Sequence, residues 1–187
     1  LGTLAPILLA AALLSAVGVA VSTLPDRAAG QRRDVAAALD GCRGRPELLV
    51  PFAFGFADRF AAGFFGLVGT FYFRDAFGLD PAAIGLLLAC FFVPFALLQY
   101  PFGRLSDRVG RAVPVVIGSV CYGLGIIGVG VAPTLSVAIA AMVAVGILGA
   151  LVSPATMALV TDVASAETRG AALGGFNVFG SLGFLAG

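Results

Sequence analysis

The sequence predicts an all-α protein, a polytopic bundle of transmembrane helices. Of its 187 residues, 60% are hydrophobic and only 11% are charged, whereas a soluble domain carries about 25% charged residues. The apolar residues form continuous runs, and a transmembrane helix needs ~20 such residues. Barrel strands would instead alternate apolar and polar residues over ~10 positions. A helix also satisfies its backbone polar groups within one segment, as the bilayer core requires.

Six spans are expected. Most are uncharged runs, and the longest run, 112–161, is divided by a turn at Ala132-Pro133-Thr134. The expected spans are residues 2–23, 48–73, 82–102, 113–131, 135–160 and 170–187. The first run is also compatible with a signal peptide, but it lacks a basic n-region and is long for an h-region. Because Leu1 and Gly187 both lie inside apolar runs, we expect a piece of a longer protein with the last span incomplete.

The arginines predict the orientation. Three connecting segments, 24–47, 103–112 and 161–169, carry nine arginines, whereas the opposite connections, 74–81 and 132–134, carry only Arg74. The nine are Arg27, Arg32, Arg33, Arg43, Arg45, Arg104, Arg108, Arg111 and Arg169. Cytoplasmic loops of membrane proteins are rich in Lys and Arg. We therefore expect these three segments to be cytoplasmic in an integral protein of a bacterial inner membrane.

Enzymatic and metal chemistry find little support. The chain has no histidine, and its three cysteines, Cys42, Cys90 and Cys121, form no C-x-x-C pair. This pattern excludes the usual zinc sites and Ser-His or Cys-His catalysis. We expect no enzyme activity, no cofactor and no metal.

The connection between the third and fourth spans holds the most informative run, Gly103-Arg104-Leu105-Ser106-Asp107-Arg108-Val109-Gly110-Arg111-Ala112. Two antiparallel helices need a tight turn, and Gly103 and Gly110 permit close approach or positive φ. Asp107 is placed to cap or to complement the positive N-terminus of the next helix, and the arginines offer partners to carboxylates on neighbouring helix ends.

This run closely resembles the G-x-L-x-D-R-x-G-R-[RK] signature of the major facilitator superfamily. The matching positions are Gly103, Leu105, Asp107, Arg108, Gly110 and Arg111. Ala112 departs from the final basic position, as is common in the second copy of the signature. The segments around Pro25, from Asp162 to Gly174 and from Gly180 to Gly187 are similar to the end of the family's sixth helix, its tenth-to-eleventh connection and its glycine-rich eleventh helix.

The resemblance implies helices six to eleven of a twelve-helix protein. Residues 1–23 would end the first half, 24–47 would form the interdomain loop, and 48–187 would belong to the second half. In the competing assignment the signature lies between the second and third helices. That assignment adds a helix before the first, and 139–146 lacks the arginine that often marks the fourth helix. We favour the second-half assignment.

The family implies secondary active transport of a small solute by alternating access, with proton coupling as one option. The expected partners are a small-molecule substrate, the lipid bilayer and the missing N-terminal half of the same chain, with no nucleic acid. The signature would act as a cytoplasmic latch together with Asp162 and Arg169, and we expect Asp162 to pair with a latch arginine. The alternative is a transporter-like scaffold or chaperone that does not transport.

Four polar residues within the spans are candidates for binding substrate or a coupling ion: Asp58, Arg59, Gln99 and Asn177. Asp58 lies about 15 Å into its span, near the middle of a ~30 Å core, where charges usually mark ion or substrate paths. On a helical wheel Asp58 shares a face with small residues, Gly55, Ala62, Gly66 and Gly69, and lies opposite Phe52, Phe56, Phe60 and Phe64, so we expect it to point into the bundle.

The alternatives for these residues stay open. A structural ion pair between Asp58 and a helix of the missing half is the alternative to a coupling role. Arg59 would tune Asp58 or bind an anion. Asn177 suits either a cavity or a hydrogen bond between helices, and Gln99, near the cytoplasmic end of its span, suits a structural role.

Overall fold

The computed structural model describes residues 11–12, 14–17, 19–20, 22–23 and 44–187, which fall into two units, 1–34 and 35–187. In the first unit every described residue except Thr23, which lies in a turn, is helical. This agrees with the expected span 2–23, although much of that span, most of the loop 24–47 and Cys42 lie outside the described residues.

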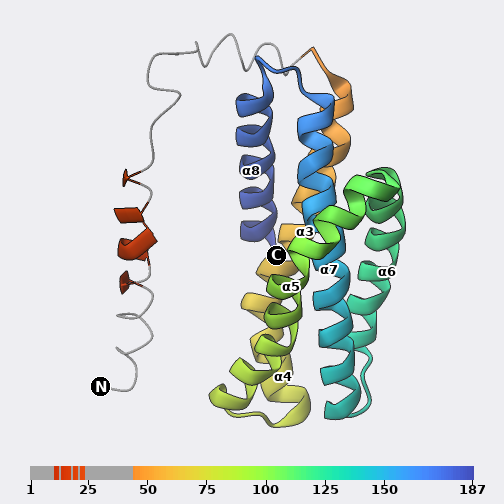
Figure 1. Cartoon of the computed structure of the whole chain (residues 1–187). Helices are drawn as coiled ribbons and strands as arrows, with labels where there is room; N and C mark the ends of the chain where they lie inside the picture. The colour runs from red at the N-terminus through yellow and green to blue at the C-terminus, as the bar shows by residue number, and fades with distance from the viewer. Residues whose placement is uncertain (1–10, 13, 18, 21, 24–43) are drawn as a thin grey trace. The chain divides into compact units, whose positions relative to one another are not determined.

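The second unit is helical throughout its described length, with short connections (Figure 1). Its elements are the 3-10 helix η1 (Pro46–Leu48) and the α-helices α3 (Leu49–Gly66), α4 (Val68–Phe77), α5 (Pro81–Val109), α6 (Ala112–Gly130), α7 (Leu135–Val163) and α8 (Arg169–Ala186). This confirms the all-α fold class. Four segments are long and apolar enough to cross a membrane, namely Pro46–Gly66, Pro81–Val109, Ala112–Gly130 and Leu135–Val163. The six expected spans are therefore not all confirmed, and α8 is not among the four.

Helix α7 is the centre of the second unit, because it packs against α3, α5, α6 and α8. Small buried residues on α7 allow this close packing, as is usual for helices in lipid. A Cβ built on Gly146 would collide with the carbonyl oxygen of Phe91 on α5. On its other side α7 receives Gly118 of α6, where a built Cβ would lie 2.7 Å from Val152.

Helices α3 and α8 form a second close pair, in which glycines oppose backbone carbonyls. A Cβ built on Gly183 would collide with the Phe56 carbonyl, and one built on Gly63 with the Phe184 carbonyl. The Phe56 side of α3 thus packs against a neighbouring helix. Gly66 departs from the expected arrangement: it is exposed, with nothing within 4 Å of a built Cβ, because the helix ends there.

The expected span 48–73 is wrong as one continuous helix. It breaks at Leu67 (φ −113°, ψ −70°), and α4 carries the chain on to Phe77. There is no proline at the break, but Gly66 and Gly69 flank it, and glycine weakens a helix interior. The Thr70 hydroxyl donates to the Gly66 carbonyl (3.2 Å), which keeps that acceptor satisfied.

The expected turn 103–112 is also wrong in extent. Helix α5 continues through Val109, so Gly103, Leu105, Asp107 and Arg108 lie in its last turns. The reversal needs only Gly110, whose φ of 88° favours glycine, and Arg111. Helix α7 likewise extends three residues past its expected end. The expected spans were delimited by apolar stretches, but each of these two helices continues with a polar terminal turn.

Candidate functional site

Arg111 is the centre of an ionic cluster at the junction of α5 and α6. After Gly110 reverses the chain, the guanidinium of Arg111 lies over the last turn of α5 and reaches the end of α7. Its Nη1 donates to Asp107 Oδ1 and, at 3.4 Å, to Ser106 Oγ. Its Nε donates to Asp162 Oδ2 at 3.1 Å. We call Ser106, Asp107, Arg111 and Asp162 the Arg111 cluster; it links two helix ends that are about 50 positions apart in sequence.

The pairing between Asp162 and an arginine of the signature is thus present in the structure. Of the two expected roles of Asp107, capping is wrong, because α6 has Arg111 at its N-cap without a side-chain cap. The Asp107 carboxylate instead binds that arginine at the N-terminus of α6. The hydrogen bonds that Arg111 donates to Asp107 and then to Asp162 raise the pKa of Arg111 above its usual range. Ser106 is the fully buried member of the cluster, whereas the side chains of Asp107 and Asp162 are exposed.

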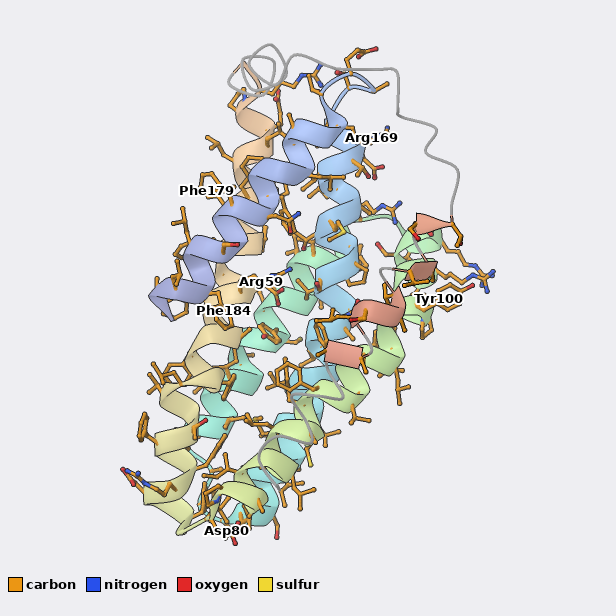
Figure 2. The ribbon with its side chains drawn as sticks, turned by 90° about the vertical axis from the view of Figure 1, so that its left-hand side faces the viewer. Arg59, Asp80, Tyr100, Arg169, Phe179 and Phe184 are labelled. Carbon is orange, nitrogen blue, oxygen red and sulfur yellow. The ribbon has the colours of Figure 1, made fainter. Side chains whose placement is uncertain are left out.

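The other signature residues lie outside the cluster. The Arg104 guanidinium lies 5.2 Å from the centre of the Tyr100 ring, a cation–π contact. Leu105 and Arg108 are exposed on the last turns of α5. Gly103 faces α7, where a built Cβ would lie 3.7 Å from Pro154 Cβ, an ordinary contact that does not demand glycine. Arg169 is exposed as the first residue of α8 and does not join the cluster (Figure 2).

Sequence reasoning missed a second link at the same end of the bundle. Arg45 Nη1, just before η1, donates to the Val163 carbonyl at 2.9 Å. With the Arg111 cluster, this contact gathers the start of α3, the α5–α6 junction and the end of α7 at one end. At the other end the Tyr72 hydroxyl of α4 donates to the carbonyls of Gly130 (2.9 Å) and Val129 (3.3 Å) at the end of α6.

The candidate residues inside the spans lie on three helices: α3, α5 and α8. Asp58 of α3 is half-buried and makes no hydrogen bond or ion pair with a described residue. Arg59 is exposed about midway along α3, and its stem lies against α8 (Figure 2), where a Cβ built on Gly180 would lie 3.1 Å from Arg59 Cγ. Arg59 is thus the sequence neighbour of Asp58, but the two side chains form no ion pair.

Gln99 and Asn177 stand apart from Asp58. Gln99 is half-buried on α5. Asn177 is exposed, and its Nδ2 donates to the Leu173 carbonyl of its own helix at 3.1 Å. The amide nitrogen therefore does not make the hydrogen bond between helices that was one of its two expected roles. Of the described residues, none links Asp58, Gln99 and Asn177 by a hydrogen bond or ion pair.

Sequence reasoning missed two polar residues of α6. Tyr122 is 7% exposed, and its ring packs against Gly149 of α7, where a built Cβ would lie 3.2 Å from Tyr122 Cε2. Ser119, one turn earlier, has a buried Oγ without a hydrogen-bond partner among the described residues. The available signal was the presence of two hydroxyls at i and i+3 in an otherwise apolar run.

Comparisons with known proteins agree with the signature. A family model described as Major Facilitator Superfamily matches residues 48–187. Multidrug resistance protein 1 of Bacillus subtilis is 29% identical over 109 residues, which cover 58% of this chain and 28% of that protein. Multidrug resistance protein 2 of the same organism is 28% identical over 116 residues (62% and 29%). The uncharacterized MFS-type transporter MJ1317 of Methanocaldococcus jannaschii is 33% identical over 96 residues (51% and 23%).

The chain spans less than a third of the length of each of these relatives. No solved structure matches the chain. The family model nevertheless covers α3 to α8 and includes the six matching signature positions at the α5–α6 junction. This integral membrane chain therefore belongs to the major facilitator superfamily.

Proposed function

We propose that the chain is part of a secondary transporter that moves a small solute by alternating access. Family membership and the relatives' names support transport. Two relatives are named multidrug resistance proteins, which makes small organic molecules the first substrates to test. The observation that carries the mechanism is the Arg111 cluster, in which one cation links the α5–α6 junction to the end of α7.

In this proposal the Arg111 cluster is the latch of the inner gate. Alternating access requires one helical bundle to rock against another, so each bundle must keep its helix ends together during the movement. Exposed ion pairs contribute only ~0–1 kcal/mol, yet a two-state equilibrium of a few kcal/mol responds to such differences. Arg108 and Arg169, exposed at the same end, would contact the other half of the transporter.

The orientation and the helix numbering are parts of the same proposal. The cluster end carries the arginine-rich connections, so it would face the cytoplasm of a bacterial cell. The chain would supply helices six to eleven, with residues 24–47 as the loop between halves. The broken α3–α4 segment would then be the seventh helix, and its midplane carboxylate, Asp58, would face the centre of the transporter.

Asp58 is proposed to bind the coupling proton or a substrate cation. An ionisable group in the hydrocarbon region is costly and usually belongs to an ion or substrate path. Asp58 satisfies this description, since it lies within α3 and no described residue hydrogen-bonds its carboxylate. Arg59 would tune its charge or bind an anion.

Counterflow in proteoliposomes tests the proposal. The whole transporter is reconstituted, and exchange of labelled for unlabelled probe is measured. Small organic cations serve as probes, because Asp58 is proposed to bind a proton or a substrate cation. Exchange above that of protein-free vesicles, reduced by excess unlabelled probe, is expected. A folded protein that exchanges no probe from a broad panel, yet binds another membrane protein, would favour the scaffold alternative.

A further inference from the structure

The last turn of α7 is held from two sides by arginines of other segments. Arg111, at the start of α6, donates from Nε to the Asp162 carboxylate at 3.1 Å. Arg45, just before η1, donates from Nη1 to the Val163 carbonyl oxygen at 2.9 Å. The two acceptors belong to neighbouring residues, one through its side chain and the other through its backbone. The position of this turn therefore depends on both contacts.

The Val163 carbonyl needs a donor from outside its own helix. The last four carbonyl groups of an α-helix have no partner within the helix, and cationic side chains at this end satisfy them and complement the helix dipole. Helix α7 has no basic residue in its last turn, and its C-cap, Ala164, is extended (φ −76°, ψ 142°). The chain thus leaves α7 without the left-handed glycine turn that binds such carbonyls in many helices. Arg45 supplies both the donor and the positive charge.

The backbone around Arg45 is fixed, so its side chain starts from an anchored position. The Arg45 carbonyl accepts a hydrogen bond from the Leu48 amide at 3.1 Å, which closes η1, and Pro46 restricts the chain directly after Arg45. Leu48 is 2% exposed and belongs to a buried cluster with Val160 and Ala164 at the end of α7. The apolar contact and the hydrogen bond therefore join the same two parts of the chain.

We infer that Arg45 is a positioning residue of the Arg111 cluster. By binding the Val163 carbonyl, Arg45 keeps the last turn of α7 in place, so that the Asp162 side chain in this turn stays within reach of Arg111. The inference rests on the proposed function and deepens it, because it adds to the latch a residue that lies outside the signature. It also joins the latch to the start of α3, the helix that carries Asp58.

The alternative is that Arg45 caps α7 without any effect on the cluster. Both interpretations predict that loss of Arg45 loosens the end of α7, but they differ in whether Arg111 responds. Arg111 is the N-cap residue of α6, and its carbonyl accepts from the Val115 amide at 3.2 Å. Release of its guanidinium should therefore loosen the first turn of α6. Hydrogen exchange at the two helix ends separates the interpretations without a measurement of transport.

The test is amide hydrogen exchange of the whole transporter in lipid nanodiscs, measured by mass spectrometry. In Arg45→Met the last turn of α7 should exchange about tenfold faster, the effect of losing one hydrogen bond from a charged donor. The first turn of α6 should exchange about twofold faster, since the contact between Arg111 and Asp162 is exposed. Arg45→Lys, which keeps a cationic donor, should restore most of the protection at both ends. In the Asp162→Ala background Arg45→Met should affect α7 but not α6, because Arg111 has already lost its contact with α7.

Arg74→Met is the matched control, because it removes an exposed arginine that pairs with Asp75 at the other end of the bundle; the ends of α6 and α7 at the cluster should exchange as in wild type. Wild-type exchange at the end of α7 in Arg45→Met would overturn the inference. Faster exchange at α7 alone, or an equal rise at α6 with and without Asp162, would overturn the positioning role and leave Arg45 as a simple cap. If Arg45→Met does not fold, Arg45→Gln is judged by the same criteria. A wild-type ratio of inward- to outward-facing states in Asp162→Ala would instead contradict the proposed latch and leave the exchange result standing.

Discussion

Replacing Asp162 by alanine removes one arm of the Arg111 cluster and leaves the other. Arg111 loses its 3.1 Å hydrogen bond to α7 but keeps Asp107 and Ser106 on α5. The α5–α6 junction is therefore released from the end of α7 without a change in the buried packing. We expect the fold to persist and the transporter to populate its inward-facing state more, because the latch is proposed to hold the inner gate shut.

The expected change in the ratio of inward- to outward-facing states follows from the solvent exposure of the two side chains. The side chain of Arg111 is 25% exposed and that of Asp162 is 53% exposed, so solvent screens the pair and its contribution is ~0–1 kcal/mol. At 1.4 kcal/mol per tenfold change, the ratio of inward- to outward-facing states should change by at most about fivefold. The pKa of Arg111 is raised, so its positive charge is present below its usual pKa and is lost only as pH rises beyond the raised value. The latch arginine should therefore stay charged across physiological pH.

Spin-label distances between the cytoplasmic ends of the two halves measure this ratio in the whole transporter. Asp75→Ala is the matched control, because it breaks an exposed arginine–aspartate pair (Arg74 Nε to Asp75 Oδ1, 2.8 Å) at the other end of the bundle. A wild-type distance distribution in Asp162→Ala would refute the latch. An equal change in both variants would show that the ratio responds to surface charge and not to this contact.

Two further predictions concern packing and topology. Gly183→Ala should destabilise the α3–α8 pair by ~1–3 kcal/mol, because its Cβ would collide with the Phe56 carbonyl. Gly174→Ala, on the same helix with nothing within 4 Å of its Cβ, should be neutral or stabilising by up to about 1 kcal/mol; urea unfolding in detergent compares the two, and equal stabilities would contradict the packing. Cys42 should react with a membrane-impermeant maleimide only after cells are opened, and labelling of intact cells would reverse the proposed orientation.

The fold class could be predicted because apolar run length is a local property of the sequence. The helix ends could not. Arg104 is charged, so the span was ended before it, whereas the structure continues α5 through Asp107 and Arg108 to Val109. The break at Leu67 also escaped prediction, because the usual signal, proline, is absent and two glycines with the Thr70 hydroxyl take its place.

The candidate site was predicted in part for a similar reason. Opposite charges at one end of a bundle have few partners, so the pairing of Asp162 with a signature arginine could be predicted. The choice of Arg111 as the partner of Asp162 could not be predicted, because it depends on the positive φ of Gly110, which directs Arg111 back over α5. Tyr122 and Ser119 were not singled out, because hydroxyls within the apolar run that forms α6 carry no charge that would mark them in the sequence.

The most direct test of the central claim compares wild type with Asp58→Asn in proteoliposomes that contain the whole transporter. Uptake of a probe cation driven by a pH gradient and counterflow without a gradient are measured on the same preparations. We predict that Asp58→Asn loses uptake against a gradient but retains folding, insertion and a measurable exchange of probe. Wild-type uptake by Asp58→Asn at normal expression would show that the carboxylate has no coupling role, and the account of the midplane site would be wrong.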